Sequence, residues 1–170
     1  LLSKYIETAN TVAQLVIAAP EVHLERVLNC SATELVAQPA CLKELVTDLG
    51  LQVLRRPLTP EQFEDINALL ALGETMEEKL EDLIVLLLTN PSFLYRSETG
   101  TDPSAAVSKL SDYEIASLLS FTLIGTTPDE ALLAAAAAGF TTVTLRQHAS
   151  RLVESTSSRD VLVTFVKDWF

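Results

Sequence analysis

Carboxylate side chains are concentrated in the segment 61–82, which has eight Asp and Glu residues and one lysine. Two pairs in it, Glu77/Glu81 and Glu78/Asp82, stand four residues apart, so on a helix each pair of like charges is adjacent and mildly repulsive. Such a face can be kept for a basic partner or a cation, and it is also typical of a solvated helix surface. Our hypothesis is that these four carboxylates contact a basic partner.

Three other patterns could do chemistry, and each has an ordinary structural explanation. Paired carboxylates can act as general acid and base, but the sequence does not place them in a cleft. Arg55 and Arg56 could hold an anion, or could bond the last carbonyls of their own helix. His148 lies between Arg146 and Arg151 without a nucleophile motif, and the chain has no phosphate-binding loop and no EF-hand spacing. We therefore assign no catalytic residue.

The two cysteines, Cys30 and Cys41, have ten residues between them. Together with His23 and His148 they do not readily form a structural zinc site, and the absence of a Cys-x-x-Cys-His run excludes covalently attached haem. A disulfide between the cysteines would contribute about 2–3 kcal/mol if unstrained. Two buried thiols are the alternative. We expect no metal and no cofactor.

Composition limits the classes of partner. The net charge of −11 and a pI of about 4.5 repel phosphate backbones, which argues against general nucleic-acid binding. Uninterrupted apolar runs such as Leu83 to Leu88 are far too short to span a bilayer. Apolar residues make up 48% of the chain, enough for a real core, and only five glycines are present, which favours helices.

The elements that would carry these residues are helices with their own start and stop signals. The joint 56–60 ends one helix before Pro57 and starts the next with Thr59 as N-cap and Gln62 as its capping-box partner. Apolar residues at three- and four-residue steps predict a helix over residues 1–18. The same signals predict further helices over about 39–55 and 75–90, and helices that begin near Ser111, Thr127–Glu130, Thr144 and Ser157 or Ser158.

The chain is therefore expected to be all-α, with about eight helices in two packed units. The polar stretch 97–104 has no periodicity, so we place the boundaries at 1–96 for the first unit, 97–107 for a linker and 108–170 for the second unit. Trp169 and Phe170 end the last helix, and we expect them to pack in the core. The alternative is an exposed patch that needs a further segment.

Two stretches resemble a known pair of domains. The first is RRPLTPEQFEDI…LIVLLLTNPSFLYRSE, and the second is KLSDYEIASLLSFTLIGTTPDEALLAAAAAGF, continuing to FVKDWF. Together they resemble planctomycete-type secreted proteins built from a cassette of uncharacterised helical domains that often accompanies cytochrome c modules. The resemblance covers roughly residues 41–170. It departs in one run, where Leu118 and Ile124 stand in place of an arginine and a tryptophan that are common in the family.

The resemblance implies export to the periplasm or the extracellular space, as part of a larger bacterial protein. An oxidising compartment favours a bridge between Cys30 and Cys41. No catalytic residue is carried over from the family. A cytochrome c-type module becomes a possible protein partner, and the chain itself is expected to have no membrane span.

Three hypotheses about function follow. The leading one is a non-catalytic scaffold or interaction module, in a setting of extracytoplasmic electron transfer. The alternative is an enzyme or accessory module in polysaccharide degradation, which would use acidic residues between the two units. The third is a redox carrier that borrows haem from a neighbouring chain. Whether the chain is an enzyme stays open, with a non-catalytic role favoured.

Overall fold

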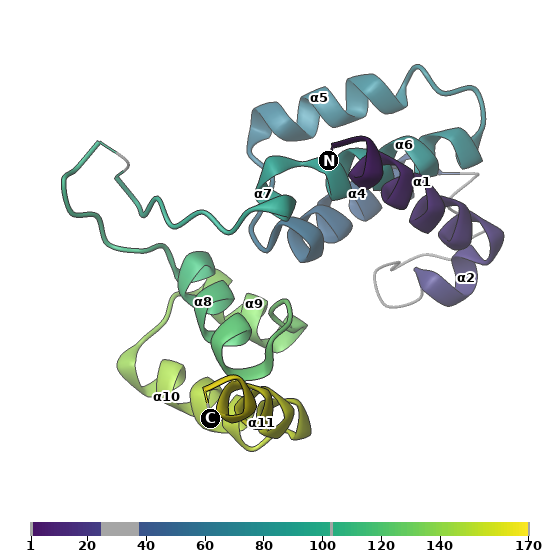
Figure 1. The fold of residues 1–170 in the computed structure, drawn as a ribbon. Coiled ribbons are helices and arrows are strands. Elements are labelled where there is room, and N and C mark those ends of the chain that lie inside the picture. The colour runs from purple at the N-terminus through teal and green to yellow at the C-terminus, as the bar shows by residue number, and fades with distance from the viewer. Residues whose placement is uncertain (1, 25–37, 103, 170) are drawn as a thin grey trace. The chain divides into compact units, whose positions relative to one another are not determined.

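The computed structural model describes residues 2–24, 38–102 and 104–169 of the chain (Figure 1). In these ranges it has ten helices and no strand, so the prediction of an all-α fold is confirmed and the expected number of about eight helices is close. The helices are α1 (Leu2–Ala18), α2 (Pro20–His23), α4 (Pro39–Leu54), α5 (Pro60–Leu70), α6 (Met76–Thr89), α7 (Pro91–Leu94), α8 (Asp112–Ile124), α9 (Glu130–Ala138), α10 (Thr142–Val153) and α11 (Thr156–Trp169).

The chain divides into two compact units, Leu1–Arg96 and Ser97–Phe170. In the first unit α6 is the central element, because α1, α4, α5 and α7 all pack against it. Its fully buried Leu83 and Leu87 lie in one core cluster with Leu45 of α4. On α1 the buried residues are Ala9 and Ala13, whose small side chains let the backbones of α1 and α6 come close together.

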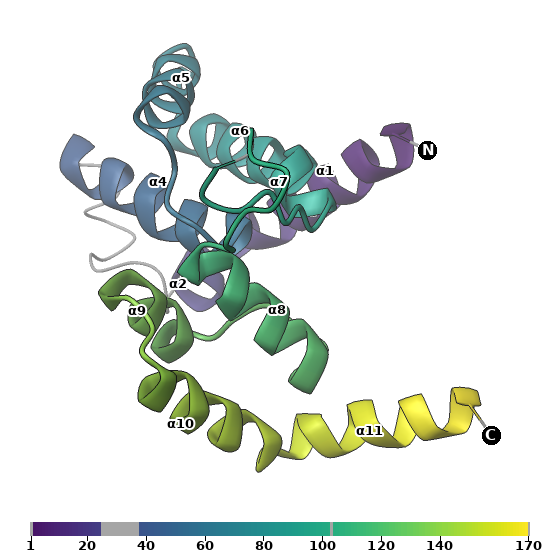
Figure 2. The same cartoon turned by 90° about the vertical axis from the view of Figure 1, so that its left-hand side faces the viewer.

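In the second unit α8 is central, and α9, α10 and α11 pack against it (Figure 2). The core is small: Ala116 of α8 meets Leu132 and Ala136 of α9 and Leu152 of α10. The buried hydroxyl of Ser120 donates to the carbonyl of Thr126 at 2.8 Å. Ser120 has no exposed surface, and this bond satisfies the only polar atom of its side chain.

The predicted caps explain where most helices begin. Capping boxes are present at Thr59/Gln62, Thr75/Glu78 and Ser111/Glu114, as the sequence predicts. In each, the hydroxyl of the N-cap residue accepts from the backbone N–H three residues later, and the side chain at that position accepts from the N-cap N–H. Gly125 ends α8 with a left-handed φ of 68°, which a glycine adopts at no steric cost.

Two helix starts differ from the prediction. α10 begins one turn earlier than expected, because the hydroxyl of Thr141 accepts from Thr144 N–H at 3.1 Å and makes Thr144 the third helical residue instead of the cap. α11 begins at Thr156, because the hydroxyl of Ser155 accepts from Ser158 N–H at 3.3 Å. In both places several hydroxyl residues could cap a helix, and the most N-terminal one does.

The stretch expected as a linker, 97–107, is bonded to the start of α8. One carboxylate oxygen of Glu114 accepts from the N–H groups of Thr99 and Gly100, at 2.8 and 3.0 Å. The backbone N–H of Thr101 donates to the carbonyl of Lys109 at 2.8 Å. The described part of this stretch is therefore a loop that folds back on the second unit.

Candidate functional site

The four predicted partner-binding carboxylates lie at the start of α6, as their spacing predicts. Glu77, Glu78 and Asp82 are exposed, and Glu81 is half-buried. Glu77 and Glu78 stand in the first turn, where the partial positive charge of a helix N-terminus stabilises carboxylates. Glu81 and Asp82 lie beyond that turn, so the helix dipole gives them little stabilisation.

Glu78 has a structural role that the other three carboxylates lack in the described contacts. Its Oε2 accepts from the N–H of Glu74 at 2.7 Å and from the N–H of Thr75 at 3.2 Å. These bonds close the capping box of α6. The charge of Glu78 therefore stabilises the start of α6, whereas the described contacts give no such role to Glu77, Glu81 and Asp82.

The described residues offer no cluster of three or more His, Cys, Asp or Glu side chains that could hold a metal ion. Likewise, none of the helices that the structure describes combines the length and apolar character needed to cross a bilayer. Of the two cysteines, Cys41 is only 3% exposed and lies in the core of the first unit, next to α4 residues such as Leu45. Cys30 lies outside the described residues, so the disulfide stays a prediction.

Arg55 and Arg56 tie the α4–α5 joint to α7. Arg55, at the C-cap of α4, is 6% exposed and has a left-handed φ of 62°. Its guanidinium donates to the carbonyl of Val53 in its own last turn, as expected, and also to the carbonyl of Ser92, 37 residues away. Arg56 donates to Ser92 Oγ at 3.2 Å and to Gln62 Oε1 at 3.1 Å.

This arrangement favours a structural role for the arginine pair over an anion site. Burial lowers the pKa of Arg55, and the neighbouring positive charges of Arg56 and Arg96 lower it further. The guanidinium still carries its charge at neutral pH, because arginine is not deprotonated in proteins. A left-handed non-glycine residue is strained by about 1 kcal/mol or more, and the long-range bonds of Arg55 hold it in place.

His148 lies beside an ion pair. The carboxylate of Asp129, the N-cap of α9, accepts from both terminal nitrogens of Arg151 on α10 and also from Leu132 N–H at 2.9 Å. His148 Nδ1 is 3.4 Å from the same guanidinium, and the His148 ring stands edge-on to Phe140. These contacts join α9 to α10, and they supply no nucleophile for the histidine to activate.

The expectation that Trp169 packs in the core is wrong, and Phe170, which shared that expectation, lies outside the described residues. Its side chain is 72% exposed, and Leu162, Phe165 and Val166 of the same helix are also exposed. The rings of Phe165 and Trp169 are 5.6 Å apart, so they form one aromatic surface. The sequence shows an amphipathic helix here, but its spacing does not tell which apolar face is covered.

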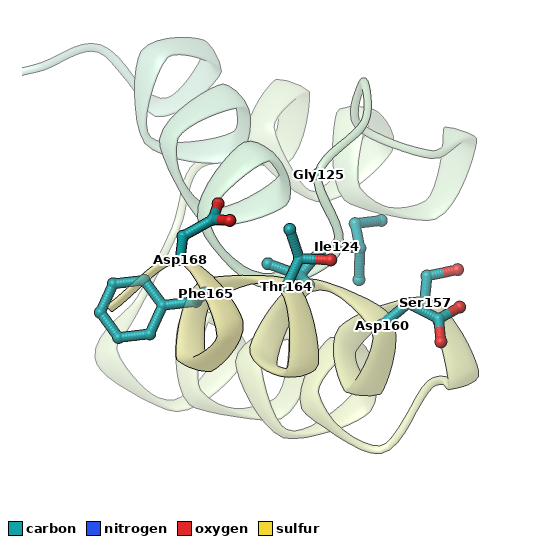
Figure 3. Close-up of a pocket in the computed structure, with 8 residues that line it drawn as sticks. Ile124, Gly125, Ser157, Asp160, Thr164, Phe165 and Asp168 are labelled. Atoms are coloured by element: carbon teal, nitrogen blue, oxygen red, sulfur yellow. The ribbon is translucent and has the colours of Figure 1, made fainter. Parts of the chain in front are cut away.

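An open groove of about 510 Å³ runs between α11 and the end of α8 (Figure 3). We call it the α11 groove, and its lining includes Ile124, Asp160, Val161, Thr164, Phe165 and Asp168. Both of its charged lining residues are acidic. Ile124 is one of the two positions at which the chain departs from the family pattern described above, but nothing in the sequence alone indicates a groove there.

Comparisons with known proteins agree with the division of the chain. Residues 41–98 match the family model PSD5, described as Protein of unknown function (DUF1595). Residues 110–170 match the model PSD4, described as Protein of unknown function (DUF1592). Both families are typical of planctomycete proteins associated with cytochrome c. No curated protein and no solved structure matches the chain. Two separate stretches of the chain are thus similar to domain families whose function is unknown.

Proposed function

We propose that the chain is a non-catalytic interaction module of a larger exported bacterial protein, and that it binds a basic partner through the start of α6. The observation that carries this proposal is the position of Glu81 and Asp82. They extend the negative surface past the first turn, where the helix dipole no longer explains it. Like-charge neighbours four residues apart cost an isolated helix a few tenths of a kcal/mol, which a cationic partner would offset.

A basic c-type cytochrome is the partner class that we propose, in a setting of extracytoplasmic electron transfer. The match to families typical of cytochrome c-associated proteins supports this choice. Opposite charges steer such encounters and give them a strong dependence on ionic strength. The alternative function in polysaccharide degradation stays a prediction.

The test is a binding titration of the full chain with a basic c-type cytochrome at low and at high salt. We expect binding that weakens several-fold as the Debye length falls from about 30 Å at 0.01 M to about 8 Å at 0.15 M. Charge reversal with Glu81→Lys and Asp82→Lys should abolish it. Reversal of Glu61 and Asp65, exposed on α5, is the matched control. An affinity that ignores both salt and reversal of all four α6 carboxylates would refute the proposal.

Export carries a second expectation, a disulfide between Cys30 and Cys41. The burial of Cys41 supports this disulfide, because a bridge from Cys30 to Cys41 would attach to the core of the first unit. Intact mass of the native protein, alkylated without and then with prior reduction, tests it. A bridged monomer is lighter by two hydrogen atoms and takes up alkylating agent only after reduction. Two thiols that alkylate without reduction would argue against both the bridge and the exported location.

A further inference from the structure

The polar stretch between the two units is bonded to the second unit almost from its first residue. A polar stretch without periodicity usually behaves as a flexible linker. Here Oε1 of Glu114, in the first turn of α8, accepts from the N–H groups of Thr99 and Gly100, at 2.8 and 3.0 Å. The chain is therefore attached to the second unit from Thr99 onward.

After Gly100 the stretch doubles back on itself. The N–H of Thr101 donates to the carbonyl of Lys109 at 2.8 Å, and the N–H of Asp102 donates to Ser108 Oγ at 2.9 Å. Gly100 permits this return, because its φ is 72° and an added Cβ would lie 2.7 Å from Ser108 Cβ. The bonds close a loop, so the chain inside that loop adds nothing to the reach of the linker.

On the other side, the first unit holds the chain as far as Tyr95. The N–H of Tyr95 donates to the carbonyl of Pro91 at 2.9 Å and closes α7. Three residues, Arg96 to Glu98, then lead to Thr99. A chain spans at most about 3.6 Å per residue, so Tyr95 and Thr99 can be no more than about 14 Å apart. This limit holds whatever Arg96 and Glu98 contact.

We propose that Glu114 is a clip that keeps the connection between the two units short. Without the clip, the connection would run from Tyr95 to Ser111, the N-cap of α8, and could extend to about 55 Å. The effective concentration of one unit near the other falls with about the −3/2 power of the length of the connection, so a fourfold lengthening lowers it about eightfold. A partner that binds both units at once therefore gains from the clip.

Three variants separate the clip from the helix cap. Glu114→Ala removes the acceptor of the two loop amides, but it also removes part of the capping box of α8. Ser111→Ala is the matched control, because it removes the cap hydroxyl and leaves the Glu114 carboxylate in the chain. The third variant keeps Glu114 and inserts about twelve Gly and Ser residues between Ser97 and Glu98, which lengthens the connection and leaves the clip intact.

Small-angle X-ray scattering of the full chain at neutral pH measures the length of the connection. The maximum dimension should be the same in wild type and Ser111→Ala. In Glu114→Ala and in the insertion variant it should be larger by roughly 10–40 Å. A helical circular-dichroism spectrum in every variant shows that the helices themselves are kept.

Trypsin cleavage after Lys109 measures the clip directly, because the Lys109 carbonyl is bonded to Thr101 in the closed loop. Followed by mass spectrometry, this cleavage should be several-fold faster in Glu114→Ala than in wild type, since a protease needs the local chain to open. It should stay slow in Ser111→Ala and in the insertion variant. Long dimension with slow cleavage would thus mark the insertion variant, and long dimension with fast cleavage would mark Glu114→Ala.

Four results would overturn the proposal. Rapid cleavage after Lys109 in wild type, which needs no variant, would show that the loop is not held. An unchanged dimension in Glu114→Ala, beside an expanded insertion variant, would show that the carboxylate does not set the length. Equal expansion in Ser111→Ala would assign the effect to the start of α8. No expansion in the insertion variant would show that something other than the connection limits the distance between the units. The clip acts whether or not α6 binds a cytochrome, so a failed cytochrome titration would reject only the proposed function.

Discussion

Replacing Glu114 by glutamine tests whether one carboxylate holds the loop before α8 in place. Its Oε1 accepts from the N–H groups of Thr99 and Gly100. Its Oε2 accepts from the N–H and the hydroxyl of Ser111, at 2.7 and 2.8 Å. A glutamine of the same shape keeps one acceptor oxygen, but it presents an amide NH₂ group to the donors at the other end.

The expected loss follows from that mismatch. Hydrogen bonds to a charged acceptor contribute about 1.5–3 kcal/mol when buried, and less where water competes. Glu114 is half-buried, and glutamine loses the bonds at one end together with the charge at the other. We therefore expect the free energy of unfolding of the second unit to fall by about 2 kcal/mol. For a domain of this size, 1 kcal/mol corresponds to about 4–8 °C in Tm.

The pH dependence gives a second signature. Partial burial raises the pKa of Glu114, but the hydrogen bonds from Ser111, Gly100 and Thr99 outweigh it and hold the pKa below its ordinary value of 4.5. The contribution of the carboxylate is therefore complete at neutral pH and is lost as pH falls below 4.5 through the lowered pKa. Wild type and Glu114→Gln should differ in Tm at pH 7 and converge at acid pH.

The assay combines calorimetric Tm between pH 7 and pH 3 with amide hydrogen exchange by NMR. In the variant, the amides of Thr99 and Gly100 should lose protection while amides in the middle of α8 keep theirs. Glu130→Gln, exposed in the first turn of α9, is the matched control and should change Tm little. Retained protection at both loop amides, or an equal Tm at pH 7, would refute the assigned role of Glu114.

Three further substitutions probe other parts of the structure. Gly100→Ala should lower the unfolding free energy by about 1–3 kcal/mol in urea titrations, since its φ is 72° and an added Cβ would lie 2.4 Å from Ser108 Oγ. Asp129→Asn should lower the free energy of unfolding by about 1 kcal/mol or less, because the ion pair between Asp129 and Arg151 is exposed. Hydrogen bonding from Arg151 lowers the pKa of Asp129, so the difference in Tm between wild type and variant should fade in thermal scans below pH 3.8. Leu83→Ala should lower the free energy of unfolding by about 3–5 kcal/mol in the same urea titration, since the Leu83 side chain is fully buried in the core of the first unit.

Local signals in the sequence predicted the fold well where one residue decides a helix boundary. Thr59, Thr75 and Ser111 cap helices as predicted, because each has its capping-box partner three residues later and few competitors nearby. The predicted starts of α10 and α11 are wrong because both lie in runs of Thr and Ser. In such runs, the point at which the preceding helix ends decides which hydroxyl caps the next helix. Short-range sequence patterns do not encode that point.

Sequence patterns do not predict contacts between residues that are far apart in the chain. The bond from Arg55 to the carbonyl of Ser92 joins residues 37 positions apart, and only packing of α4 against α7 brings them together. Trp169 shows the same limit, since helical spacing assigns it to an apolar face but does not say whether anything covers that face. The acidic residues of α6 lie on a helix, as their spacing predicts, because helix formation there depends on local signals.

The contacts of the arginine pair also bear on where function lies. The resemblance to the two-domain family rests in part on the run Arg55-Arg56-Pro57-Leu58-Thr59 and on the run from Asn90 to Arg96, in which position 92 is not part of the motif. In the structure these runs bond to one another, and Asn90 caps α7 by accepting from Ser92 N–H. The two arginines of the first run and Asn90 of the second thus help to hold the first unit together. These two runs thus serve the structure of the first unit, and the acidic start of α6 lies outside both of them.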